Sequence, residues 1–116
     1  MAPGGAAPGY LYRHSMVWAP EADGFYVFGG WGDGGYRNKL HFYDRQANQW
    51  IEVTPSGTVP SERSQHAAVW APALHGFYVS GGDSRDRGWF MDLYFYDRTA
   101  NKWSEVTAAG QVPEWR

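Results

Sequence analysis

The sequence predicts an all-β chain made of two similar antiparallel units. Three observations support this prediction. The chain of 116 residues contains two copies of one pattern, one directly after the other. Each copy holds short runs of β-branched and aromatic residues, separated by glycine, proline, aspartate and asparagine. No stretch shows the apolar period of a capped helix, so we expect a helix content close to zero.

The two copies can be aligned residue by residue. They are offset by roughly 52 residues, and the second copy has one extra residue after its double glycine. The clearest matches are 14–20 (HSMVWAP) with 66–72 (HAAVWAP), 24–30 (GFYVFGG) with 76–82 (GFYVSGG), 40–45 (LHFYDR) with 93–98 (LYFYDR), 47–50 (ANQW) with 100–103 (ANKW), and 57–60 (GTVP) with 110–113 (GQVP).

We expect four strands in each copy. The first ends at an Ala-Pro pair, the second at a double glycine, and the third at an aspartate that favours a turn into the fourth. The expected strands are 14–19, 25–28, 40–43 and 50–53 in the first copy, and 66–71, 77–80, 93–96 and 103–106 in the second. Each copy is thus a four-stranded antiparallel meander, and the repeat length indicates blades of a β-propeller.

The ordered motifs of each copy resemble the kelch repeat. They are a double glycine, an aromatic-Tyr-Asp run, a tryptophan, and Pro-x-x-Arg-x-x-His before the next strand. The resemblance covers nearly the whole chain, twice. It implies kelch-type propeller blades at 14–54 and 66–107, with connectors at 1–13, 55–65 and 108–116.

The recurring residues are expected to build the blades rather than a binding site. Glycine pairs permit close backbone approach and backbone angles closed to other residues. Trp50 and Trp103 are large amphipathic plates that suit packing between neighbouring sheets. Arg63 and His66 are expected to tie one blade to the next through hydrogen bonds.

The segments after the two double glycines are the candidate recognition loops. Both mix acidic, arginine and aromatic residues, a composition typical of an adaptable binding surface. The candidate binding residues are Trp31, Asp33, Tyr36, Arg37, Asn38, Asp83, Arg85, Asp86, Arg87 and Trp89. The alternative is a polar hairpin tip that serves only solubility.

Composition and motifs argue against other function classes. The net charge of −2 offers no electrostatic footprint for nucleic acid or an acidic membrane surface. The chain has no cysteine, no helical metal-binding histidine pair and no nucleophile-elbow or phosphate-loop motif. We therefore expect no enzyme activity, no cofactor and no metal. With neither a signal peptide nor a long apolar run, a cytoplasmic location is expected.

Two blades cannot close a propeller ring, and each would leave a broad aromatic face uncovered. The ring is therefore expected to be completed by oligomerisation, most simply as a homotrimer with six blades, although two or four copies remain possible. At the seam between copies, Arg116 and His14 would take the places of Arg63 and His66, and Leu11 leaves the arginine position vacant in the first connector.

Alternatives remain open at this stage. The chain can be a fragment of a longer kelch propeller, or a designed propeller with no evolved partner. A binding scaffold that presents its loops to another protein is the favoured function, and an enzyme or small-ligand site in the central channel is the alternative.

Overall fold

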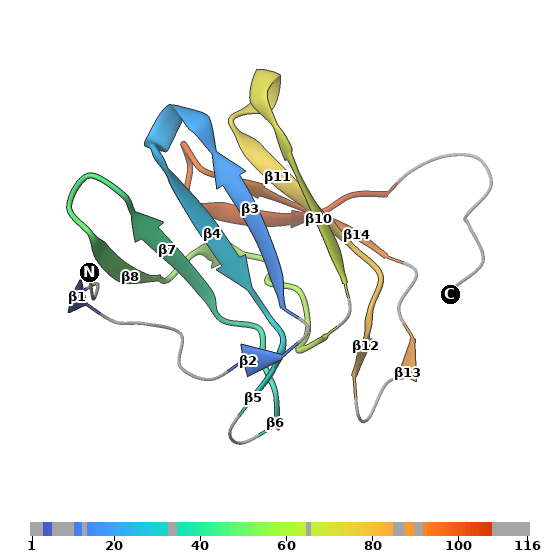
Figure 1. The fold of residues 1–116 in the computed structure, drawn as a ribbon. Helices are drawn as coiled ribbons and strands as arrows, with labels where there is room; N and C mark the ends of the chain where they lie inside the picture. The colour runs from blue at the N-terminus through green and yellow to red at the C-terminus, as the bar shows by residue number, and fades with distance from the viewer. Residues whose placement is uncertain are drawn as a thin grey trace.

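The computed structural model describes residues 4–5, 11–12, 14–32, 35–64, 66–84, 88–89 and 92–107. Over these residues the chain forms two twisted five-stranded sheets, one for each repeat, and two smaller sheets of three and two strands, and it contains no α-helix (Figure 1). The all-β prediction is confirmed. Within the described residues, no helix is long and apolar enough to cross a membrane.

The first sheet, blade 1, is a meander of four antiparallel strands. They are β3 (Ser15–Ala19), β4 (Gly24–Phe28), β7 (Leu40–Asp44) and β8 (Gln49–Val53), each paired with the next. A fifth strand, β1 (Gly4–Gly5), runs parallel to β8 at the outer edge.

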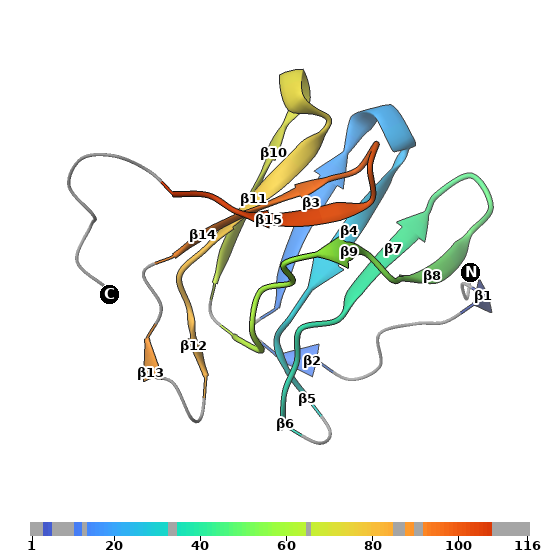
Figure 2. The same cartoon turned by 180° about the vertical axis from the view of Figure 1, so that it is seen from behind.

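The second sheet, blade 2, repeats this topology. Its strands are β10 (Ala67–Ala71), β11 (Gly76–Ser80), β14 (Leu93–Asp97) and β15 (Lys102–Glu105). Its outer strand is β9 (Ser56–Gly57), parallel to β15 (Figure 2). The expected count of four strands per blade is therefore corrected to five, because the segment before each blade adds two residues to its outer edge.

The same turn chemistry recurs in both blades. The 3₁₀ turns η1 (Pro20–Ala22) and η2 (Pro72–Leu74) follow the Ala-Pro pairs and end in left-handed residues, Asp23 and His75. In the hairpins between the last two main strands, Asn48 and Asn101 take the left-handed conformation that asparagine tolerates. The side chain of each accepts a hydrogen bond from the blade's tyrosine, from Tyr43 Oη at 2.5 Å and from Tyr96 Oη at 2.7 Å.

The two candidate recognition loops form short hairpins at one end of the molecule, opposite the 3₁₀ turns (Figure 1). In blade 1, β5 (Trp31–Gly32) pairs with β6 (Gly35–Tyr36) and also with β2 (Leu11–Tyr12). In blade 2, β12 (Asp83–Ser84) pairs with β13 (Gly88–Trp89), and Asp83 also forms a bridge to Ser64.

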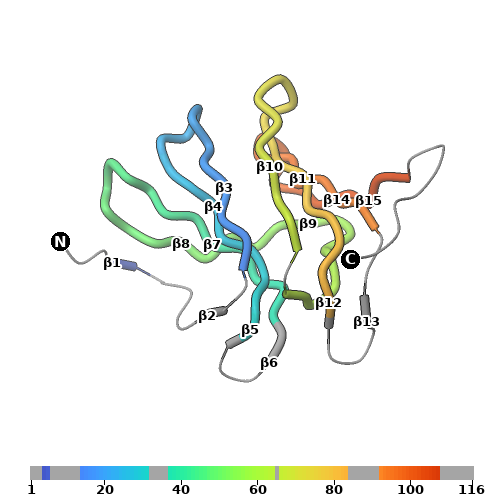
Figure 3. Tube along the Cα trace, turned by 45° about the vertical axis from the view of Figure 1, so that its right-hand side comes forward, coloured from blue at the N-terminus to red at the C-terminus, as the bar shows by residue number. Residues whose placement is uncertain are grey.

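The sheets pack face to face, and their first main strands, β3 and β10, lie next to each other. From these two strands the blades splay apart toward their outer edges (Figure 3). The core therefore lies in the wedge between the sheets. This is the arrangement of adjacent propeller blades.

Candidate functional site

The interface between the two blades, here called the junction, is sealed by apolar and aromatic side chains from both sheets. Blade 1 contributes Val17, Ala19, Tyr26, Phe28 and Leu40, and blade 2 contributes Phe77, Val79, Tyr94, Tyr96 and Trp103, all of them buried. Aromatic rings meet across it, with centroids 5.4 Å apart for Tyr26 and Phe77 and 5.0 Å apart for Phe28 and Trp103. These separations are those of favourable tilted aromatic pairs.

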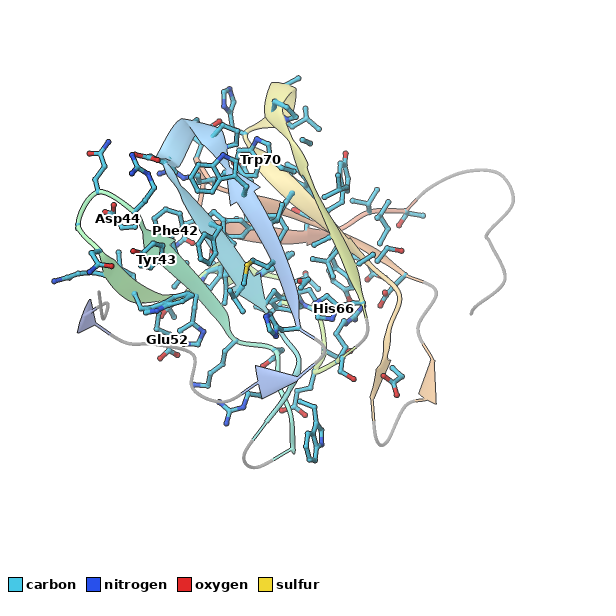
Figure 4. All side chains as sticks on the ribbon, viewed as in Figure 1. Phe42, Tyr43, Asp44, Glu52, His66 and Trp70 are labelled. Carbon is cyan, nitrogen blue, oxygen red and sulfur yellow. The ribbon has the colours of Figure 1, made fainter. Side chains whose placement is uncertain are left out.

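His66 links blade 2 to the last residue of β4. Its Nε2 lies 2.9 Å from the Phe28 carbonyl oxygen and 2.7 Å from Ser15 Oγ, and Figure 4 places it where the first main strands begin. Because a carbonyl only accepts, Nε2 carries the hydrogen and donates it. Burial lowers the pKa of His66 to about 4, so the imidazole is neutral at neutral pH.

The double glycine of blade 1 is what allows this close approach. Gly29 and Gly30 have φ values of 69° and 98°. A Cβ on Gly29 would lie 2.8 Å from His66 Cε1 and 2.9 Å from the Arg63 carbonyl oxygen. Only glycine meets both the conformational and the steric requirement here.

Arg63 fixes the connector between the blades. Its side chain has no exposed surface and donates to both carboxylate oxygens of Asp92, at 2.7 and 3.0 Å, and to the Gly81 carbonyl. Its backbone bonds the loop of blade 1, through Gly30 and Arg37. The hydrogen bonds of Arg63 and His66 therefore tie blade 1 to blade 2, as the sequence predicts.

A polar contact closes the junction at the end with the 3₁₀ turns. Glu21 of blade 1 accepts a hydrogen bond from His75 Nδ1 at 2.6 Å and lies 3.6 Å from Arg98 Nη1 of blade 2. All three side chains are partly solvent-exposed, so this contact adds orientation more than stability.

The outward face of blade 1 carries a copy of the aromatic trio that blade 2 buries in the junction. The outer trio is Phe25, Tyr43 and Trp50, and the junction trio is Phe77, Tyr96 and Trp103. Centroid separations in the outer trio are 5.2, 5.7 and 5.3 Å. The corresponding values in the junction trio are 5.4, 5.6 and 5.3 Å. The tilts between the rings also agree closely.

The outer trio differs from the junction trio in exposure. Trp50 is only half-buried, and beside it Trp18 and Met16 expose 47% and 56% of their surfaces. Figure 4 shows Tyr43 and Glu52 on the β7 and β8 side, facing away from blade 2. Val27 and His41 on the same face are buried, so the exposed part is the band around the trio. Apolar surface of this kind is typical of an interaction site.

The outward face of blade 2 is also apolar, and it is hollowed. Its Val69 exposes 62% of its surface. A depression of about 380 Å³ is lined by Ala67, Ala68, Val69, Tyr78, Ser80, Leu93 and Val106. The repeat alignment identifies its origin, since Ser80 stands at the position of Phe28, the residue whose ring fills the corresponding place in the junction.

Exposure or hydrogen bonds are described for four of the ten predicted loop residues. Trp31 lies on β5 and exposes 40% of its surface. Asn38 donates to the Pro60 carbonyl at 3.2 Å, and Asp83 accepts from Ser64 Oγ at 3.0 Å. Arg37 bonds the connector through its backbone. Three of the ten thus help to anchor their loops.

The other predicted site residues are described less fully. The backbone of Tyr36 and of Trp89 lies in β6 and β13. Asp33, Arg85, Asp86, Arg87 and the seam residue Arg116 lie outside the described residues. The other seam residue, His14, is partly buried directly before β3.

Neither the Asp92 partner of Arg63 nor the hollow at Ser80 is among the sequence-based predictions. The alignment holds a signal for the hollow, because Phe28 and Ser80 are the one unlike pair in two otherwise identical seven-residue motifs. It holds none for Asp92, whose aligned residue is Lys39. Among the residues that the structure describes, no cluster of three or more histidine, aspartate or glutamate side chains forms a metal site.

Comparison with known proteins gives one consistent result. A family profile described as the KLHDC2/KLHL20/DRC7 Kelch-repeats domain matches residues 1–116. The Rab9 effector protein with kelch motifs of Rattus norvegicus is 34% identical over 108 residues, which cover 90% of this chain and 29% of that protein. Kelch domain-containing protein 2 of Bos taurus is 30% identical over 78 residues, covering 67% of this chain and 19% of that protein. The chain thus spans less than a third of the length of these relatives.

Proposed function

The chain belongs to the kelch-repeat family, and we propose that it acts as a non-catalytic protein-interaction module. Its two blades form part of a propeller ring that further blades complete. The hairpins β5–β6 and β12–β13, which lie at one end of the molecule (Figure 1), then bind a partner protein. A kelch-repeat unit is typically a scaffold of this kind.

One observation supports the proposed ring. The outward faces of the two blades repeat the two faces that meet in the junction. The outward face of blade 1 repeats the aromatic trio that blade 2 presents at the junction. The outward face of blade 2 is apolar like the blade 1 side of the junction. A sheet with such a face is stabilised by a neighbouring blade.

Three copies of the chain give six blades and are the simplest closure, with His14 of one copy and Arg116 of another at each seam. A head-to-tail contact that closes on itself also avoids growth into a fibre. The alternative source of blades is a longer chain, and the small share of each relative that this chain covers is the observation in its support. Either source leaves the hairpin end available to a partner.

The hairpin end is supported as the partner-binding surface by Trp31, a large aromatic side chain that stays 40% exposed on a strand anchored to the connector. Tryptophan is enriched among the residues that dominate binding energy at protein interfaces. The rat relative is named as an effector protein, and that name supports a protein partner for this chain as well.

The test compares the proteins crosslinked in cells to the wild-type chain with those crosslinked to two variants. Trp31→Ala should lose the specific partners, whereas Lys102→Ala, an exposed change on β15, should keep them. Both variants must retain the wild-type melting temperature. If Trp31→Ala keeps every partner at wild-type level, the hairpin end is not the binding surface.

A further inference from the structure

We infer that a second copy of this chain docks on blade 2, with its outer trio, Phe25, Tyr43 and Trp50, seated over the hollow at Ser80. This inference rests on the ring part of the proposed function and adds the register of the contact. The geometry of the junction defines that register, because each outward face aligns with a junction face residue by residue.

The docking copy contributes its outer trio, whose rings are already arranged as those of the junction trio. The outer trio holds the separations and tilts of the junction trio although no blade covers it. The hydrogen bond from Tyr43 Oη to Asn48 Oδ1, at 2.5 Å, fixes its tyrosine as the bond to Asn101 fixes Tyr96. A preorganised apolar anchor loses little conformational entropy on docking.

The receiving surface keeps most of what the junction trio contacts on blade 1. Val17, Tyr26, Leu40 and Val53 have the counterparts Val69, Tyr78, Leu93 and Val106, which all line the hollow. Two residues become smaller, with Ala67 and Ser80 in place of Ser15 and Phe28. The contact between copies is therefore apolar like the junction. It leaves empty the place at Ser80 that the Phe28 ring fills in the junction, where the ring lies 5.0 Å from that of Trp103.

The contact between copies has fewer polar interactions than the junction. His14 of the incoming copy takes the place of His66 and can donate to the Ser80 carbonyl, but Ala67 supplies no hydroxyl in place of Ser15. Ala73 stands where Glu21 contacts His75 and Arg98. The seam between copies is thus weaker than the junction, and association should be reversible and dependent on concentration.

The decisive variant restores the residue that the junction uses. Ser80→Phe should fill the hollow and lower the dissociation constant between copies by about tenfold or more, measured by sedimentation equilibrium. Thr99→Phe adds the same ring to an exposed turn away from this face and should leave the constant unchanged. If Ser80→Phe and Thr99→Phe lower the dissociation constant equally, the added ring promotes association nonspecifically and the proposed register is wrong.

A second variant guards against a folding defect in the first. Trp18→Ala removes a side chain that is 47% exposed beside the outer trio, so folding should be retained while association weakens. If copies associate but neither Ser80→Phe nor Trp18→Ala changes the constant, a different surface holds them and the inference is wrong. If all variants stay folded monomers, copies do not dock at all. In both cases the crosslinking comparison between the wild-type chain and Trp31→Ala still tests the proposed partner binding separately.

Discussion

The junction trio and the outer trio have nearly the same sequence surroundings and the same ring geometry, yet only one of them is buried. Trp103 keeps 1% of its surface exposed, whereas Trp50, at the equivalent position of blade 1, is half-buried. The arrangement of the rings is therefore set within each blade by its own strands and turns. Burial, by contrast, comes from the neighbouring sheet, so stability depends on which faces are covered.

A second difference between the blades is electrostatic. In blade 2, Arg63 and Asp92 form a two-bonded ion pair beneath the loop. In blade 1 the aligned residues are Leu11 and Lys39, and Lys39 instead pairs with Glu52 at 3.2 Å on the surface. The second loop is fastened by the charge pair of the buried Arg63, whereas Lys39 at the aligned position of Asp92 pairs on the surface, so the two blades should respond differently to the loss of these residues.

The largest expected effect comes from truncating the two equivalent tryptophans. Trp103→Ala should lower the free energy of unfolding by about 3–5 kcal/mol, because it opens a cavity in the junction. Trp50→Ala should cost about 1–2 kcal/mol, since its side chain is already partly solvated. Urea unfolding of both variants measures this difference. Equal losses would mean that the outer face of blade 1 is as fully packed as the junction.

The next effect separates the two ion pairs. Asp92→Ala should cost about 3 kcal/mol or more, because it leaves the buried Arg63 guanidinium without its carboxylate. Lys39→Ala should cost about 0.5 kcal/mol or less, since both partners of its pair are exposed. Thermal unfolding of the two variants side by side checks the prediction. A neutral Asp92→Ala would show that other acceptors satisfy Arg63.

The junction should also weaken in mild acid. Folding lowers the pKa of His66 from 6.5 to about 4, so the unfolded chain binds a proton that the folded chain rejects. The stability from this group is complete above pH 6.5 and is lost progressively as the pH falls toward 4, at up to about 1.4 kcal/mol per pH unit.

His66→Gln should flatten this part of the curve of unfolding free energy against pH. His75→Gln is the matched control, because His75 is exposed at the other end of the junction. A slope that survives in His66→Gln would have to come from a different group.

The smallest effect is expected at the end with the 3₁₀ turns. Glu21→Gln removes the charge facing His75 and Arg98 and should cost about 0.5 kcal/mol or less, with the loss shrinking further in high salt. Chemical denaturation at low and high ionic strength gives this value. A loss that is large and independent of salt would make this contact as important as the buried ones.

Much of this architecture could be predicted from the sequence, because strand ends coincide with residues whose backbone chemistry is specific. The double glycines, the Ala-Pro pairs and the asparagines at the hairpins all lie where the repeats place them. The outer strands β1 and β9 were missed because two residues such as Gly4 and Gly5 contain no alternation. Their pairing depends on the path of the connector.

The candidate site was harder to predict for two physical reasons. Loop composition does not separate a side chain that is free to bind from one that anchors its own loop, and Asn38 and Asp83 have anchoring hydrogen bonds. The pair between Arg63 and Asp92 breaks the repeat, so alignment of the two copies gives no hint of it. Ser80 stands out in the alignment, but its meaning depends on which face of β11 points away from blade 1.

We propose that further copies cover the outward faces, and side-chain footprinting with hydroxyl radicals measures that cover residue by residue. In dilute solution Met16 and Trp18 should be oxidised readily, and Trp103 should be protected. As the concentration of the chain rises, Met16 and Trp18 should become protected in step with an increase in mass above 13.1 kDa, while Trp103 stays unchanged. If Met16 and Trp18 remain equally reactive at every concentration, no second copy covers the outward face of blade 1.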